Sequence, residues 1–361
     1  MKRYRTIGNG CGRAMASCCK GVWCLVLSAL SSLCLFTSCN TIDEDMSDCG
    51  STVTYDLTLV TNINTEIETQ LETELSTEVE LEIAKRLREY LKNIFTDHAH
   101  DVNLSFYDTD GEGERLHHDE HIMDANQASY TLNLPMREYM HLASANLVNN
   151  KEVSLEDDKL CRTSMLRQVE GDTVKNHTTG LFTARQPMKV LEGINQQFKV
   201  HLYMANCAAA LILDPRSQKV KDVKVFSTGF ATRFHINDST YYYPANPPMV
   251  RTDELRVQNQ RVFCSVNFPS KEKDDTRIVI EDAEAFDAEA GDVSLWSFDV
   301  QVTLVDGSIT RTMLNYKNPL KAGQLRVAKG WIGDDGVVYT EDSEVATAVT
   351  LDWKGGLVIN N

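Results

Sequence analysis

The chain has 361 residues, of which 42% are hydrophobic, with 36 basic against 52 acidic side chains and a formal net charge of −16. This length is enough for two domains of ordinary size, each able to bury its own core. The acidic balance argues against nucleic acid as a partner and against adsorption to anionic membranes, because both require an excess of positive charge.

An apolar segment near the start, VWCLVLSALSSLCLFTSC at residues 22–39, organises the first part of the chain. Five basic side chains precede it, and no acidic side chain comes before Asp43. A basic region, an apolar region and small residues before a cleavage point are typical of a secretory signal. Because the segment is shorter than the roughly 20 residues of a membrane-spanning helix, we predict a signal peptide over residues 1–38.

The end of this segment, LFTSC at residues 35–39, resembles a bacterial lipobox, in which the cysteine is acylated and becomes the new N-terminus. Acyl chains contribute about 0.8 kcal/mol per buried CH₂, so lipid on Cys39 would hold the protein on a membrane. The alternative is an ordinary signal peptide that ends in an incidental cysteine. Without residues 1–38, 31 basic side chains face 52 acidic ones, a net charge of −21, so membrane attachment has to come from the lipid.

Residues 39–52 are short, polar and acidic, which predicts a tether between the lipid and the first domain. An acidic run in this position also resembles the export signal of surface-exposed lipoproteins in Bacteroides-type bacteria. A solvated linker is the plainer interpretation, and both can hold together.

Four cysteines remain in the folded part, at positions 49, 161, 207 and 264. An exported protein permits disulfides, and four cysteines allow three pairings that the sequence alone does not separate. We favour a disulfide between Cys49 and Cys161 in the first domain and interpret Cys207 and Cys264 as buried thiols. The spacings match no CxxC zinc pattern.

The first domain is predicted to combine strands with one long helix. Alternating apolar and polar residues over 53–59 predict a strand with one buried face. Apolar residues then recur at every fourth position over 65–95, without Gly or Pro, which predicts one long helix, or two with a break near Ser76. Further strands are expected at 102–106, 130–134 and 140–148, and irregular structure at 149–185.

A new strand pattern opens at Phe198, after Pro187 and Gly193, so we predict domains over residues 53–190 and 191–361. Many short strands without alternating helices favour an antiparallel β-sandwich for the second domain. The strands expected there are 209–213, 223–226, 262–266, 277–280, 295–305, 310–314, 325–328 and 345–353.

Histidine is the one suggestive enrichment for chemistry, because five histidines lie near carboxylates within residues 98–121. Imidazoles with carboxylates are ligands for zinc or copper. The five lack the HExxH arrangement, and adjacent residues of a strand point to opposite faces, so we expect a solvated polar loop and no metal. Residues 108–114 superficially resemble a calcium loop, but Asp119 stands where the closing glutamate belongs. These histidines are His98, His100, His117, His118 and His121.

The sequence contains no GxSxG, GxxxxGK[ST] or GxGxxG motif, so we expect no enzyme and no cofactor. Residues 241–244, three tyrosines and a proline, are compatible with an aromatic ligand platform. An edge loop that packs on its own sandwich is the expected structure, because Pro marks strand edges and loops.

Three features together resemble the FimB-like fimbrium-anchoring lipoproteins of Bacteroides-type bacteria. DMSDC at residues 45–49 is close to the (D/E)-D-L-S-D-C segment at the start of that family. FYDTDG at residues 106–111 is similar to the Phe-Asp-x-(D/N)-Gly strand end of the family's first domain. The all-β second half has the family's length, whereas the helix over 65–95 departs from its usual short connection.

The resemblance implies a mostly β protein of two tandem transthyretin-like antiparallel β-sandwich domains, with the long helix inserted in the first. It also implies a lipid-anchored, surface-exposed protein of the cell outer membrane, serving as anchor or accessory subunit at the base of a fimbrium. Its partners would be a fimbrial stalk subunit, joined by β-strand exchange, and the outer membrane through the lipid on Cys39. In strand exchange, backbone hydrogen bonds supply affinity and alternating side chains fill pockets.

An anchor has reason to keep its own first strand, because no subunit lies beneath it. No arginine occurs between Cys39 and Val53 for a trypsin-like processing protease, which fits an intact N-terminus. The last strand, over 345–353, is where we expect contact with the adjoining subunit. The residues predicted to make this contact are Val345, Val349, Leu351 and Trp353.

The alternative of a different class is a glycan-binding surface lipoprotein of a nutrient-uptake system, which shares the lipid cysteine, the acidic tether and the β-sandwiches. Exposed Trp or Tyr platforms would favour glycans, whereas an unpaired strand edge would favour strand exchange. A secreted hydrolase would need clustered carboxylates or a metal site in a cleft.

Overall fold

The structure is a computed structural model that describes residues 51–57, 79–95, 101–109, 112–119, 129–192, 194–271, 278–280, 295–340 and 347–350. The chain divides into two compact units, Met1–Asp48 and Cys49–Asn361, and every described residue lies in the second. The predicted signal peptide, Cys39 and nearly all of the tether therefore lie outside the described residues. Within the described part of the chain, no helix is long and apolar enough to span a bilayer.

The described residues are mostly β, as predicted, and their strands form five sheets. Sheet I has the order β10 (Gln196–Val200), β1 (Ser51–Leu57), β4 (Ser129–Leu134). Sheet II has the order β11 (Tyr203–Met204), β9 (Phe182–Lys189), β5 (Glu138–Ala145), β2 (Val102–Asp108), β3 (Arg115–Asp119). Sheet III has the order β19 (Ile278–Ile280), β15 (Thr240–Tyr243), β14 (Arg233–His235), β7 (Met165–Gln168), β6 (Val153–Glu156).

The other two sheets belong to the later part of the sequence, apart from one short strand. Sheet IV has the order β21 (Ile309–Tyr316), β20 (Trp296–Leu304), β13 (Val220–Thr228), β16 (Met249–Arg251), β8 (Thr173–Lys175). Sheet V has the order β17 (Asp253–Val257), β18 (Gln260–Asn267), β12 (Cys207–Asp214), β22 (Gln324–Ile332), β23 (Val338–Thr340), with β24 (Thr347–Thr350) also paired to β22. The helices are α3 (Leu81–Phe95) and the short 3₁₀ helix η2 (Cys161–Thr163).

Period-two patterns build the cores of these sheets. Val102, Leu104 and Phe106 of β2 are buried and share a core with Leu132 and Leu134 of β4, so sheets I and II enclose an apolar interior. The opposite face of sheet II, through Tyr107 and Leu142, joins a second core that sheet III covers.

Sheets IV and V form a sandwich whose core is rich in aromatic and β-branched side chains. Trp296, Phe298, Val300 and Val302 of β20 face the odd-numbered residues of β12 across this core. The even-numbered residues of β12 are also buried, on the other face of sheet V. A strand buried on both faces reads as a continuous apolar run, which explains the sequence CAAALILD.

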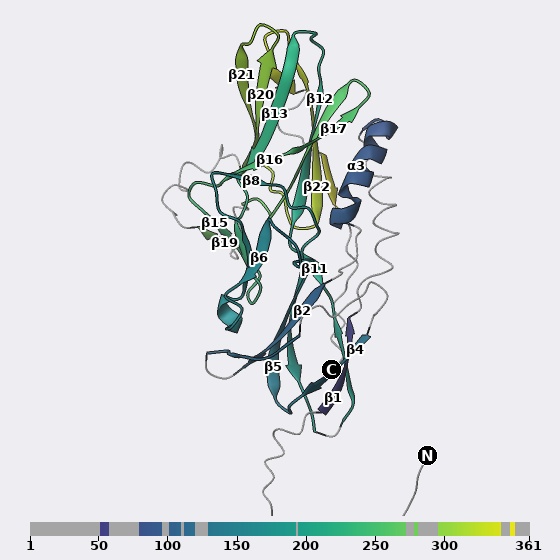
Figure 1. Ribbon diagram of the computed structural model, residues 1–361, viewed down its shortest axis with the longest axis vertical. Coiled ribbons are helices and arrows are strands. Elements are labelled where there is room, and N and C mark those ends of the chain that lie inside the picture. The colour runs from purple at the N-terminus through teal and green to yellow at the C-terminus, as the bar shows by residue number, and fades with distance from the viewer. Residues whose placement is uncertain are drawn as a thin grey trace, which may run out of the picture. The chain divides into compact units, whose positions relative to one another are not determined.

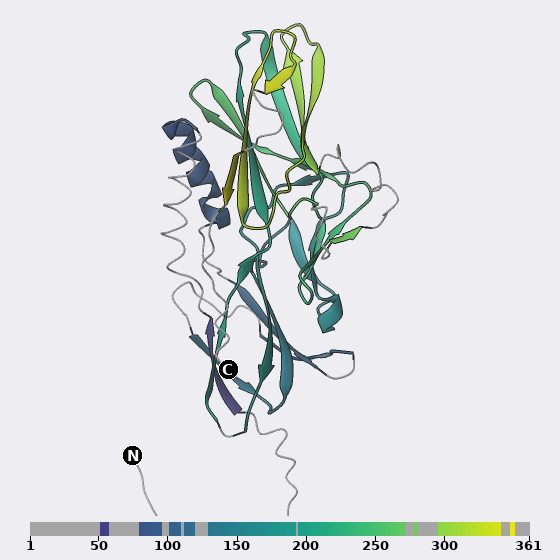
Figure 2. The same ribbon diagram turned by 180° about the vertical axis from the view of Figure 1, so that it is seen from behind.

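Helix α3 covers this second face of sheet V, alongside β17 and β22 in both views (Figures 1 and 2). Leu87 and Leu91 are fully buried, and Ala210 on β12 leaves room for the helix to approach. Tyr90 donates a 2.5 Å hydrogen bond to Asp253 of β17. The helix lies between β1 and β2 in chain order but packs on sheet V. Residues 65–78 of the predicted 65–95 helix lie outside the described residues.

The prediction of irregular structure over 149–185 was wrong. This segment contains β6, η2, β7, β8 and the start of β9. The strands look polar because only alternate residues are buried, as in the pattern of β7, where Leu166 and Gln168 are buried and their neighbours are not.

Strands from either side of residue 190 pair with each other in four of the five sheets. These pairs are β1 with β10, β9 with β11, β7 with β14, and β8 with β16. Not all pairings are antiparallel, because β1–β10, β12–β22, β15–β19 and β8–β16 are parallel. The division into domains over 53–190 and 191–361, and their transthyretin-like form, stay predictions.

An ion pair with one buried partner on sheet IV gives a stability prediction. Asp299 is only 1% exposed and accepts two hydrogen bonds from the exposed Arg311, of 2.8 and 2.6 Å. Replacing Arg311 by Met leaves the buried carboxylate without this partner, and we expect a clear loss of stability in urea unfolding. Arg256→Met, which removes an exposed pair with Glu254, should change stability by at most about 0.5 kcal/mol. Equal losses in the two variants would contradict the prediction.

Candidate functional site

The first strand of the described chain is held on both sides. β1 pairs in parallel with β10, with Tyr55 opposite Phe198, and antiparallel with β4, with Tyr55 opposite Tyr130. A strand in the middle of a sheet has its backbone donors and acceptors used on both edges. β1 therefore completes sheet I from within the same chain.

The predicted last strand forms one edge of sheet V. Within the range 345–353, Thr347–Thr350 is β24, and it pairs antiparallel with Gln324–Val327 of β22. β23 occupies the rest of the same edge of β22. Among the described strands, β22 is the only partner of β24, so its second edge faces no described strand. Val349 lies opposite Leu325, while Val345, Leu351 and Trp353 lie outside the described residues.

On the opposite side of sheet V, two segments cover the outer edge of β18. β17 pairs with the first part of β18, and the segment after β8 takes over beyond it. The side chain of Asn176 donates to the carbonyl of Cys264 (2.8 Å) and accepts from the amide of Val266 (3.0 Å). The amide of His177 donates to the carbonyl of Val266 (3.0 Å). β24 and β17 are thus edge strands on opposite sides of this sheet, and each has one partner among the described strands.

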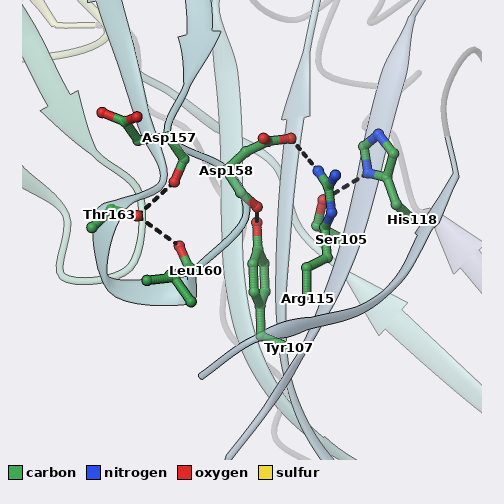
Figure 3. Close-up of polar contacts among 8 residues, drawn as sticks. All are labelled: Ser105, Tyr107, Arg115, His118, Asp157, Asp158, Leu160 and Thr163. Atoms are coloured by element: carbon green, nitrogen blue, oxygen red, sulfur yellow. Dashed lines mark hydrogen bonds and ion pairs between the residues drawn. The ribbon is translucent and has the colours of Figure 1, made fainter. Parts of the chain in front are cut away.

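The histidines of β3 do not converge on a common point. Ser105 of β2 lies opposite His118, and its hydroxyl is 2.9 Å from His118 Nδ1 (Figure 3). His117 points to the other face of the sheet, where Nε2 is 2.8 Å from Asp119. No cluster of three or more potential metal ligands occurs in the described part of the chain. The other three histidines of the enrichment, His98, His100 and His121, lie outside it.

The polar contacts next to Ser105 and His118 have a structural role, because they hold the loop that leads into η2 against the β2–β3 hairpin (Figure 3). Tyr107 donates a 2.8 Å hydrogen bond to the carbonyl of Asp158, and Arg115 forms an ion pair with the Asp158 carboxylate. Thr163 closes the loop with a 2.6 Å hydrogen bond to the carbonyl of Asp157. We find no nucleophile or acid–base arrangement among these contacts.

Two buried histidines gave no signal in the sequence, because each stands alone, His141 in β5 and His177 in the segment between β8 and β9. His141 is stacked on Phe106, and its Nδ1 is 3.0 Å from the carbonyl of Ser105. His177 meets Phe268 edge-on, and neither of its ring nitrogens has a hydrogen-bond partner among the described residues. Burial lowers the pKa of His141 to about 4 and that of His177 to about 3, since a charged imidazole is poorly solvated in the interior.

No two of the three described cysteines are bonded to each other. Cys207 and Cys264 are fully buried, as expected, and burial raises the pKa of both. Cys161 is also buried, and its Sγ donates to Asn237 Oδ1 at 3.2 Å. Cys49 lies outside the described residues, so its pairing with Cys161 stays a prediction.

The three tyrosines of β15 do not form an exposed platform. Tyr243 is buried and donates to the carbonyl of Ser270, and Tyr241 packs against the same core and donates to the carbonyl of Ala205, both at 2.9 Å. Tyr242 lies under the guanidinium of Arg233, 4.6 Å from its ring centre. The stretch packs on the protein itself, as expected, but the expected edge loop is wrong, because β15 is a strand that pairs with both β14 and β19 inside sheet III.

Comparison with known proteins gives distant likenesses only. No protein family matches the chain, and no curated protein matches it significantly. A candidate adhesin from Bacteroides ovatus is 10% identical over 75% of this chain and 85% of its own, with a TM-score of 0.47. A candidate polysaccharide-binding protein from Bacteroides thetaiotaomicron is 7% identical over 81% and 97%, with a TM-score of 0.45. The fimbrial anchor protein Mfa2 from Porphyromonas gingivalis is 12% identical over 70% and 91%, with a TM-score of 0.41. At such low values, these likenesses assign no function to this chain.

Proposed function

We propose that this protein is a lipid-anchored surface protein that serves as anchor or accessory subunit at the base of a fimbrium. Its role is mechanical and not catalytic. The lipid is carried by Cys39, the acidic segment behind it spans the distance to the folded part, and the stalk subunit is joined by β-strand exchange. The sequence at residues 35–49 supports the membrane half of this proposal.

The observation that carries the other half is the position of β1, which is paired on both sides inside sheet I. A subunit in the middle of a strand-exchange polymer has to leave a place for a neighbour's strand. A terminal subunit does not, because no subunit lies beneath it. A complete sheet I at the front of the chain fits a subunit that ends the fibre at the membrane.

The joint to the stalk would then lie at the other end of the chain. β24 has one described partner, and its free edge offers backbone amides and carbonyls for a further strand. The predicted contact residues Val345, Val349, Leu351 and Trp353 belong to this segment. Strand exchange at β24 remains a proposal that the following experiment tests.

Deleting residues 345–361 is expected to abolish attachment of the fimbrium, while the truncated protein is still exported and lipidated. Attachment is measured by co-purification of the stalk subunit from outer membranes. Val349→Pro is a milder variant, because it removes one backbone donor from β24 and keeps the chain length. Undiminished attachment in a folded, exported truncation would refute strand exchange at this edge. Cys39→Ala is the companion variant and should release the protein from the membrane.

A further inference from the structure

A groove lies on the outer face of sheet V, where the helix that covers this face begins. On β12 the buried Ile212 is followed on the same face by Asp214. On the antiparallel strand β18, Gln260 precedes the buried Val262 on that face. The face therefore changes from apolar to polar just where α3 starts, with Ile83 forming one wall. We call this hollow the α3 groove. Its volume of about 330 Å³ is at the lower end of the range for small-ligand sites, about 300–1,000 Å³.

We propose that the α3 groove binds a neutral, hydroxyl-rich saccharide. The first argument is an unmade hydrogen bond. Gln260 Oε1 is buried, and no donor among the described residues reaches it. A buried acceptor without a donor costs about 1–3 kcal/mol, and an apolar side chain, such as Val262 next to it on the same face, would avoid that cost. A ligand that donates a hydrogen bond to Gln260 Oε1 would remove this cost.

The second argument is the balance of charge around the groove. The carboxylates of Glu80 and Asp214 are matched by the cations of Arg216 and Lys329. Arg216 Nε lies 3.6 Å from Asp214 Oδ2, so these two groups already offset each other in part. An anionic or cationic ligand would be attracted by one pair and repelled by the other. Hydroxyl groups donate and accept, so a neutral ligand can serve Gln260, Asp214 and Arg216 together.

The third argument is the aromatic side of the groove. Trp331 stands beside Asp214 in the parallel pairing of β22 with β12. Its ring carries the Arg216 guanidinium at 4.4 Å and is stacked with Tyr339, with ring centres 5.8 Å apart. The guanidinium and the Tyr339 ring take up the faces of the indole and hold it upright, so that Trp331 lines the groove with the apolar edge of its ring. Polar groups on one side and a rigid aromatic group on the other suit a saccharide better than a peptide.

The test uses the full chain and a printed array of neutral, uronic-acid and amino-sugar oligosaccharides. Neutral glycans are expected to bind, and the best is then titrated by calorimetry. Gln260→Met, which keeps the length of the side chain and removes its polar atoms, should weaken binding at least ten-fold and leave the melting temperature equal or higher. Asp214→Asn should also weaken binding about ten-fold. Glu138→Gln, whose carboxylate pairs with Lys189 on sheet II, should not change the affinity.

Three results would overturn the proposal. Binding of no neutral glycan would remove the site, and a preference for uronic acids or amino sugars would remove the chemical class. A clear fall in the melting temperature of Gln260→Met would show that its amide serves the fold. The site is independent of the fimbrial role proposed above, because Gln260→Met should attach fimbriae normally and the truncation after residue 344 should still bind glycan.

Discussion

Replacing Gly180 by alanine is expected to lower the free energy of unfolding by about 3 kcal/mol, as an overpacked site in the interior does. A Cβ atom at this position would fall on the carbonyl oxygen of Ile94, far inside van der Waals contact, and would lie 3.1 Å from a ring carbon of Phe182. Ile94 is in the last turn of α3, so the clash sits where the helix meets the loop before β9. The loop is not free to retreat, because Asn146 donates a 2.9 Å hydrogen bond to the carbonyl of Gly180.

Urea unfolding and hydrogen exchange measure this effect together. We expect faster exchange over residues 81–95 in Gly180→Ala, because the helix end must move away from sheet V to make room. Gly171→Ala is the matched control, since its nearest non-bonded neighbour would be at an ordinary 3.4 Å, and it should stay within about 0.5 kcal/mol of the parent. A Gly180→Ala protein as stable as the control would show that α3 does not rest on this loop.

Lowering the pH from 7 to 4 is expected to cost about 3 kcal/mol of stability for each of the buried histidines, His141 and His177. A histidine in the unfolded chain takes up its proton near pH 6.5, whereas burial lowers the folded pKa to about 4 and about 3. Between these values the unfolded state binds more protons than the folded state. The stability that the neutral rings contribute is complete above pH 6.5 and is lost as the pH falls toward the folded pKa values.

His177→Leu separates this effect from the general acid sensitivity of carboxylates. Both nitrogens of His177 are buried and have no hydrogen-bond partner within the described part of the chain, so the variant should be as stable as the parent at pH 8 or slightly more stable. Between pH 6.5 and 4 it should lose about 1.4 kcal/mol less per pH unit than the parent, followed by urea unfolding at each pH. Identical slopes in the variant and the parent would contradict the assignment.

Local patterns in the sequence predicted most of the elements that bury a regular stripe. The four-residue repeat identified the helix that the structure describes over Leu81–Phe95, and alternation identified β1, β2 and many strands of the second half. The run at residues 207–214 could be recognised as a strand, but nothing in it states that α3 covers one face and sheet IV the other. That information lies in residues far away in the chain.

Pairing was not predictable for the same reason. β8 joins sheet IV through only three residues, and the period-two signal of so short a strand is too weak to separate it from a loop. The α3 groove needs three strands and a helix end to meet, and each contributes one or two ordinary polar residues. The last strand was predicted at the position of β24. Cys39 lies outside the described residues, so its predicted lipidation is supported by the sequence alone.

The parallel pairing of β12 with β22 bears on how this chain is made. Ala208 is synthesised well before its partner Leu325, and during that interval the apolar strand β12 lacks a neighbour on one side. Contacts so remote in sequence form slowly, and exposed apolar strands aggregate while they wait. Synthesis of this protein should therefore depend on a chaperone that shields the nascent chain until β22 has emerged.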